Sequence, residues 1–211
     1  MKNWKKESSE KIKESLPEVG DGDICSASDE LLIQRVVARD QLAFKIIYHR
    51  YYRMLYRFIS RITGYYGSTE EALNDAMYVV WDKAATFRPD TRLSTWIFGI
   101  AYNKALKSLE RGKRFQDPAY RKSLDEDHLQ DPDAFYQRLE TENWLLVAMT
   151  HLSPQQRATL ELAYYHGMSY REVADVMSCN ENTVKTRMFH ARKKMRIILP
   201  TLANRSGSEG V

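Results

Sequence analysis

The chain has little of what several specialised protein classes require. Among its 211 residues are only two cysteines, Cys25 and Cys179, too far apart in sequence to suggest a disulfide scaffold or a cysteine metal site. No apolar run approaches the ~20 residues of a membrane span. The charged N-terminus also lacks the apolar core of a secretory signal. These absences predict a protein of the reducing cytoplasm that is not inserted in a membrane.

Signs of catalysis are missing as well. The sequence has no glycine-rich phosphate loop, no Cys/His pair at a useful spacing, and no clustered carboxylates outside one acidic segment. We therefore expect no enzyme, no catalytic residue, no cofactor and no metal. The net charge is only +4, so any strongly basic surface must be local.

What the chain does have is helical periodicity, without a convincing two-residue alternation, which predicts an all-α protein. Ser28 and Asp29 can cap a helix over residues 30–40, and a second helix over 41–63 ends at Gly64. Residues 68–71, from Ser68 to Glu71, have the pattern of a capping box and predict the start of a third helix. A fourth spans about 94–113, after a loop over 87–92 in which Pro89 disfavours helix.

An acidic, proline-containing stretch separates two helical parts. The predicted layout is a flexible extension over 1–26, a first helical domain over 27–114 and an acidic linker over 115–137. A second domain over 138–200 and a flexible tail over 201–211 follow. The linker can equally be an irregular tether with no further role. In the second domain, Ser153 and Pro154 begin a helix that Gly167 ends.

Residues 152–195 have the pattern of a helix-turn-helix. Ser169 and Glu172 form a capping box, residues 178–180 are a short polar break, and Asn180 is a suitable N-cap for a helix that starts near Glu181. The apolar positions of this last helix fall on a single buried stripe: Val184, Met188, Ala191 and Met195.

The opposite face of this last helix is polar and cationic. Pointing away from the stripe are Asn182, Thr186, Phe189, His190 and Lys193, and flanking it are Lys185, Arg187, Arg192, Lys194 and Arg196. Such a face suits a DNA major groove, where the first turns reach base edges and the flanks meet phosphates. A solvated face on an ordinary helical hairpin is the alternative. The capping box, the break and the unbroken positive charge together favour DNA.

A second candidate surface lies on the helix over 94–113. Trp96, Asn103, Lys107 and Arg114 fall within about 20° on a helical wheel, with Lys104, Arg111 and Lys113 nearby. An aromatic ring beside an amide and cations suits single-stranded DNA, and the adjacent loop could hold an extruded base. Alternatively, Trp96 is an ordinary core residue and the cations are solvated.

Together the two halves resemble the extracytoplasmic-function (ECF) sigma factors of bacterial RNA polymerase, from about Asp29 to Leu199. Three segments carry the resemblance: EEALNDAMYVVWDKAATF, FRPDTRLSTWIFGIAYNKALKSLER and the helix-turn-helix. The resemblance implies two helical domains, called sigma-2 and sigma-4, joined by a linker. It also implies three partners: core RNA polymerase, promoter DNA and an anti-sigma factor. We expect a monomer in the absence of these partners.

The resemblance also implies residue roles. Core polymerase would dock on Glu71, Asn74 and Asp75, which by pattern alone are only a polar helix face. The melted minus-ten element would meet the loop, at Phe87, Arg88 and Asp90, with Asn103 behind it. The helix face adds Trp96, Lys107 and Arg111 to this candidate set, although the position of Trp96 is largely structural in the family. The duplex minus-thirty-five element would meet the last helix, at Lys185, Thr186, Phe189 and His190, and the helix itself adds Asn182, Thr183, Arg187 and Lys193.

The sequence departs from the family at two positions. His190 stands where arginine is common, and neutral imidazole cannot grip guanine bidentately, so an unusual minus-thirty-five preference is expected. Gly99 replaces a frequent basic residue, which weakens a backbone contact or bends the helix.

Two further classes compete with the sigma-factor reading. A dimeric helix-turn-helix regulator would need a ligand pocket or a dimerisation helix, and the sequence shows no clear candidate. An adaptor that binds polymerase without DNA would not need the basic face over 183–196.

Overall fold

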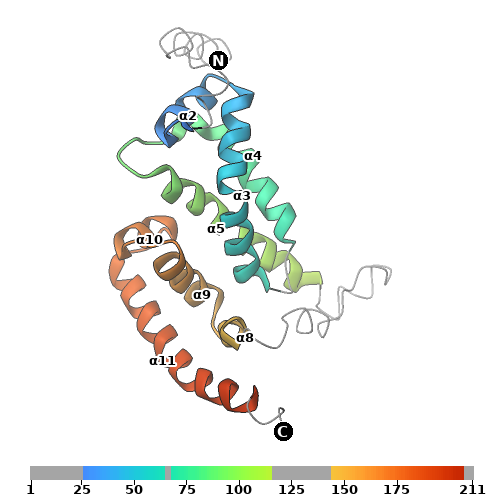
Figure 1. The fold of residues 1–211 in the computed structure, drawn as a ribbon, viewed down its shortest axis with the longest axis vertical. Coiled ribbons are helices and arrows are strands. Elements are labelled where there is room, and N and C mark those ends of the chain that lie inside the picture. The colour runs from blue at the N-terminus through green and yellow to red at the C-terminus, as the bar shows by residue number, and fades with distance from the viewer. Residues whose placement is uncertain (1–25, 65–67, 116–143, 207–211) are drawn as a thin grey trace.

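The computed structural model describes residues 26–64, 68–115 and 144–206, with side chains described for 26–64, 68–112 and 147–202. Within these ranges the regular elements are all helical, as predicted (Figure 1). The first unit contains α2 (Asp29–Val37), α3 (Gln41–Thr63), α4 (Thr69–Lys83), a short 3₁₀ turn η3 (Ala84–Thr86) and α5 (Leu93–Phe115). The predicted linker and Cys25 lie outside the described residues, apart from Phe115, which ends α5.

Side-chain caps set most of the helix starts in the first unit. Ser28 caps α2, and the Asp40 carboxylate caps α3 by accepting from the backbone N–H groups of Leu42 (2.9 Å) and Ala43 (3.2 Å). Because Asp40 has this role, α2 ends at Val37 rather than at residue 40, and Arg39 turns the chain with a φ of +65°. Gly64 ends α3 with a φ of +54°, as the sequence predicts.

The second unit contains α8 (Trp144–Thr150), α9 (Pro154–Leu160), a π-helical turn η4 (Glu161–Tyr165), α10 (Tyr170–Val176) and α11 (Glu181–Ser206). Both predicted helix starts form complete capping boxes, Ser153 with Gln156 and Ser169 with Glu172. The helix α11 continues six residues beyond the expected boundary at 200, and Pro200 lies inside it. Ile198, Leu199 and Leu202 pack against the second unit's own core, which supports this final stretch despite the proline.

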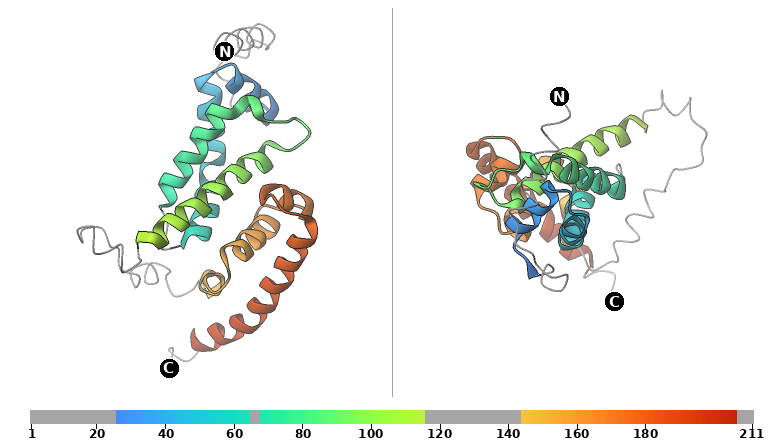
Figure 2. Two further views of the ribbon diagram at one scale, coloured as in Figure 1. Left: turned by 180° about the vertical axis from the view of Figure 1, so that it is seen from behind. Right: turned by 90° about the horizontal axis from the view of Figure 1, so that it is seen from above.

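The two units share one hydrophobic core. Core residues of the first bundle, including Phe58, Ile97 and Phe98, form one cluster with Ala158, Leu162, Met168, Val173 and Val176 of the second unit. The helix α9 packs against α3, and α10 packs against α5, while α11 covers α9 and α10 from the outside (Figures 1 and 2). The units are therefore joined by packing in this structure, and a linker is not their sole connection.

Polar groups also cross between the units. The Arg61 guanidinium of α3 pairs with Glu161, whose side chain is only 2% exposed, and Arg157 donates to the Arg61 carbonyl oxygen at 2.9 Å. Burial raises the pKa of Glu161, and the bond to Arg61 opposes that rise. The His166 ring lies against Phe98 at 4.4 Å and Phe58 at 6.2 Å between ring centres. Burial and the charge of Arg61 lower the pKa of His166 to about 4.

Gly99 lies where α5 packs against α10. A Cβ at this position would lie 3.6 Å from the carbonyl oxygen of Val176 and 3.8 Å from its Cα. A methyl group would fit, but a longer side chain would meet the backbone of α10. Gly99 therefore lets two helices of different units pack closely.

Candidate nucleic-acid interface

The helix α11 presents the predicted cationic face. Its N-cap is Asn180, whose side-chain oxygen accepts from the Thr183 N–H at 2.7 Å and from the Thr183 hydroxyl at 2.8 Å. The four apolar stripe residues are all buried. The predicted outward residues are all exposed: Asn182, Lys185, Thr186, Phe189, His190 and Lys193. Phe189 is 62% exposed, which leaves its ring available for a contact outside the chain.

Two of the predicted minus-thirty-five residues are engaged inside the protein. The Thr183 hydroxyl is used in the cap, and the half-buried Arg187 donates to the Cys179 sulfur at 3.5 Å. Lys185 remains exposed but pairs with Glu181 one turn earlier, at 2.9 Å. Arg187 and Thr183 thus support the turn before α11 in this structure, contacts that the spacing along the helix did not predict.

The first turn of α10 contacts the loop that precedes α5. Glu172 accepts from the Ser169 backbone N–H and hydroxyl, both at 2.8 Å, and these bonds lower its pKa. The Arg92 guanidinium, at the end of the 87–92 loop, lies 3.3 Å from the same carboxylate. The helix-turn-helix therefore contacts the loop that precedes α5, a contact with no signature in the sequence.

The face of α5 contains both exposed and packed members of the predicted minus-ten set. Asn103 and Lys107 are exposed on α5, and Arg88 and Asp90 are exposed on the loop. Trp96 is half-buried against the core, with its ring centre 5.7 Å from that of Phe87. The two aromatic residues therefore pack together beside the exposed polar groups. The side chains of Lys113 and Arg114 lie outside the described residues.

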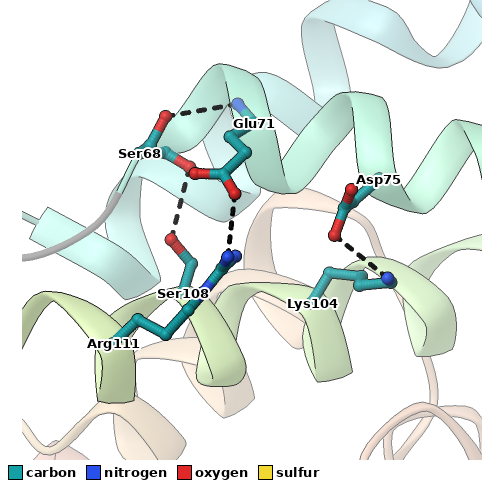
Figure 3. Close-up of polar contacts among 6 residues, drawn as sticks. All are labelled: Ser68, Glu71, Asp75, Lys104, Ser108 and Arg111. Atoms are coloured by element: carbon teal, nitrogen blue, oxygen red, sulfur yellow. Dashed lines mark hydrogen bonds and ion pairs between the residues drawn. The ribbon is translucent and has the colours of Figure 1, made fainter.

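The predicted polymerase residues lie on α4 and contact other helices of the first unit (Figure 3). Glu71 accepts from Arg111 at 2.8 Å, Asp75 accepts from Lys104 at 3.1 Å, and the Asn74 side chain accepts from the Tyr48 hydroxyl at 3.2 Å. Only half of the predicted Ser68–Glu71 capping box forms: Ser68 accepts from the Glu71 N–H, while the Glu71 carboxylate pairs with Arg111.

Sequence reasoning missed a row of tyrosines beside Asn74. Tyr48, Tyr52 and Tyr56 follow one another on α3, with ring centres 5.5 Å and 6.1 Å apart, and Phe44 packs on Trp81 at the start of the row. The signal was present as aromatic residues four positions apart, which place rings on one helix face. This row extends the candidate surface of α4 onto α3.

The second unit also has an open apolar pocket of about 410 Å³ between α8, α9, η4 and α11. Its walls include Met149, Leu160 and Met195, and Arg192 and Arg196 contribute its positive charge. The part of the chain with described side chains holds no group of three or more potential metal ligands. None of its helices is both long and apolar enough to span a membrane.

Comparison with known proteins gives one consistent result. Residues 47–115 match the family described as Sigma-70 region 2, and residues 142–195 match Sigma-70, region 4. The chain is 32% identical to the ECF RNA polymerase sigma factor SigM of Mycobacterium tuberculosis over 184 residues, covering 87% of this chain and 90% of SigM. It is 26% identical to the ECF RNA polymerase sigma-E factor of Escherichia coli over 175 residues, covering 79% and 91%.

Solved structures show the same fold. The sigma factor RpoE of Bartonella quintana, solved with the anti-sigma factor NepR, matches with a TM-score of 0.58 and 25% identity over 74% of this chain and 96% of that one. CnrH, solved with the cytosolic domain of CnrY, matches with a TM-score of 0.60 and 20% identity over 82% and 97%.

Proposed function

The chain belongs to the extracytoplasmic-function sigma factors of bacterial RNA polymerase, and we propose that it reads promoters through two surfaces, one on α11 and one on α5. As a sigma factor it is an initiation factor for promoter-specific transcription and not an enzyme. Its partners are core polymerase and promoter DNA, which places its action in the cytoplasm.

The exposed cationic face of α11 carries the proposal. Lys185, Thr186, Phe189 and His190 are exposed on its first turns, where a recognition helix meets base edges in the major groove, and Lys193 is placed for a phosphate. Each good base contact contributes roughly 1–3 kcal/mol of discrimination. The imidazole of His190 cannot make the planar, bidentate contact with guanine that a guanidinium makes, so we infer a minus-thirty-five preference that differs from that of arginine-bearing relatives.

The loop over 87–92 and the start of α5 are proposed to hold the melted minus-ten strand. Asn103 supplies a side-chain amide for a base edge, Lys107 supplies charge for a phosphate, and Phe87 with Trp96 gives an aromatic wall. Because Trp96 is half-buried against the core, its proposed part is to shape the wall rather than to stack fully on a base.

Core polymerase is proposed to dock on α4, at Glu71, Asn74 and Asp75, with the tyrosine row of α3 beside them. Tyr48 donates to Asn74, so the amide and the row form one continuous surface. The apolar pocket of the second unit, with its two arginines, suits the apolar face of a partner helix that carries acidic residues. We propose that control by an anti-sigma factor acts on such surfaces, as solved relatives bind anti-sigma factors.

The packed arrangement of the two units cannot serve both promoter elements at once. Elements centred about 25 base pairs apart are separated by about 85 Å of duplex at 3.4 Å per base pair. The helices α5 and α10 are in direct contact in this structure. We therefore propose that the units separate when the chain joins polymerase and promoter, with residues 116–143 as the tether between them.

The proposed function is tested by run-off transcription with purified core polymerase on a randomised promoter library. We expect the chain to associate with core polymerase and to select start sites downstream of a shared two-part sequence. A chain that fails to bind core polymerase, or that binds it and leaves start-site choice unchanged, contradicts the proposal. A stable dimer on a palindromic operator would favour the rival helix-turn-helix regulator.

A further inference from the structure

Two ion pairs join α4 to α5 along one seam of the first unit (Figure 3). Arg111 donates to Glu71 at 2.8 Å, and Lys104 donates to Asp75 at 3.1 Å. Glu71 and Asp75 lie one helical turn apart on α4, and their partners lie two turns apart on α5. Each pair therefore joins a carboxylate of one helix to a cation of the other.

The paired groups belong to two different proposed surfaces. The carboxylates of Glu71 and Asp75 form part of the polymerase surface on α4. Lys104 follows Asn103 directly on α5, and Arg111 lies one turn beyond Lys107, so both cations border the minus-ten surface. In the free protein, the carboxylates thus neutralise two cations that lie beside the expected path of DNA phosphates.

These pairs are exposed enough to exchange partners. Side-chain exposure is 53% for Glu71 and 41% for Arg111, and 46% for Asp75 and 27% for Lys104. Exposed ion pairs change an equilibrium only a few-fold, so a competing charge can replace either partner. Buried residues of α4 and α5, such as Leu73 and Ala101, belong to one hydrophobic cluster, which holds the helices together while the ionic groups exchange. The buried Ser108 hydroxyl also donates to the Ser68 carbonyl oxygen at 3.4 Å.

Resting on the proposed function, we propose that these two ion pairs couple polymerase docking to promoter binding. Basic groups of core polymerase form ion pairs with Glu71 and Asp75. Arg111 and Lys104 are then free to contact phosphates of the minus-ten strand. Linkage makes the effect reciprocal, because a strand that occupies the two cations also frees the carboxylates for docking. The seam thereby keeps the free protein a weak DNA binder.

The first test uses the full chain without polymerase and an oligothymidylate probe, followed by fluorescence anisotropy over a series of salt concentrations. The double variant Glu71→Gln/Asp75→Asn is expected to bind about two- to tenfold more tightly than wild type. Its salt slope should be steeper by about 1.4, since each freed cation adds about 0.7 on a single strand. The matched control is Glu70→Gln/Glu110→Gln, which changes the net charge equally at exposed positions of α4 and α5.

If both double variants gain equally in affinity for the probe and in salt slope, the effect comes from net charge alone, and the coupling is overturned. The reciprocal variant Lys104→Gln/Arg111→Gln provides the second measurement and does not depend on the first variant folding. Without DNA, it should bind core polymerase a few-fold more tightly than wild type, and unchanged or weaker binding overturns the coupling. A wild-type chain that fails to bind core polymerase contradicts the proposed function itself, whereas a transcribing wild type with unresponsive variants contradicts only the coupling.

Discussion

At the scale of single residues, Asn103 separates promoter opening from promoter binding. Its amide is exposed on α5 beside the loop proposed to hold an extruded base. Asn103→Ala should remove one base contact, which is worth about 1–3 kcal/mol, only after the strands separate. We expect permanganate reactivity of promoter thymines to fall about tenfold with little change in duplex binding. The exposed neighbour Glu110→Ala serves as the control, and normal reactivity in Asn103→Ala contradicts the assigned role.

His166 gives the packed arrangement a dependence on pH. Its pKa is about 4 in the structure, because it is buried and close to Arg61, against about 6.5 when unfolded. The unfolded chain therefore binds the extra proton first, so stability is full above about pH 6.5 and is lost as the pH falls toward 4.

Replacing His166 with phenylalanine removes this proton while keeping a ring between Phe58 and Phe98. Urea unfolding at several pH values from 7 to 4 should show a shallower loss of stability in His166→Phe, by at most about 1.4 kcal/mol per pH unit. Parallel curves for the two proteins would mean that His166 does not titrate with folding.

At the scale of elements, substitutions at Gly99 test the contact between α5 and α10 through their effect on the free energy of unfolding. A methyl group at this position would be in ordinary contact with Val176, and alanine favours helix over glycine by about 0.5–1 kcal/mol. Gly99→Ala should therefore raise the free energy of unfolding by about that amount in a urea titration. Gly99→Leu, in contrast, would press on the α10 backbone and should lower it. A loss of stability in Gly99→Ala contradicts the observed spacing.

The helix α11 is expected to hold phosphates through residues such as Lys193. Lys193→Ala should weaken binding evenly across DNA sequences and reduce the slope of log affinity against log salt by about one. Lys45→Ala, at an exposed position of α3, removes the same charge outside the two proposed DNA surfaces and serves as the control. An unchanged slope in Lys193→Ala would exclude a phosphate contact at this position.

The helices could be predicted from the sequence because their signals are local. Ser169 and Glu172 stand three residues apart, and the buried stripe of α11 repeats with the helical period, so caps and faces follow from spacing alone. The contacts between helices could not be predicted in this way. Arg61 and Glu161 are 100 residues apart, and the partners of Glu71 and Asp75 are 40 and 29 residues away.

Contacts between distant residues also explain why some helix ends and some site residues differ from the sequence-based predictions. From its sequence position, Asp40 could be the last residue of α2 or the N-cap of α3. In the structure it is the N-cap of α3, and α2 ends at Val37. Arg187 flanks the buried stripe on a helical wheel, but the wheel does not show that the Cys179 sulfur gives it a partner inside the protein. The domain boundary expected at residue 200 falls inside α11, because side chains packed on the second core continue the helix beyond it.

At the scale of the whole molecule, function requires the shared core to divide. The Arg61–Glu161 pair must be hydrated again and the rings around His166 exposed before α5 and α11 can reach elements about 85 Å apart. Contacts with polymerase and promoter must offset that cost. We propose that the protein is closed by its own packing when alone and extended when it transcribes.

The most direct measurement of this claim is energy transfer between dyes at Ala85→Cys and Asp175→Cys, which are exposed in the first and second units, with Cys25 and Cys179 replaced by serine. Transfer should be efficient in the free protein and should fall close to zero in a complex with core polymerase and promoter DNA that is shown to transcribe. Equally efficient transfer in the free protein and in that transcribing complex would contradict the account.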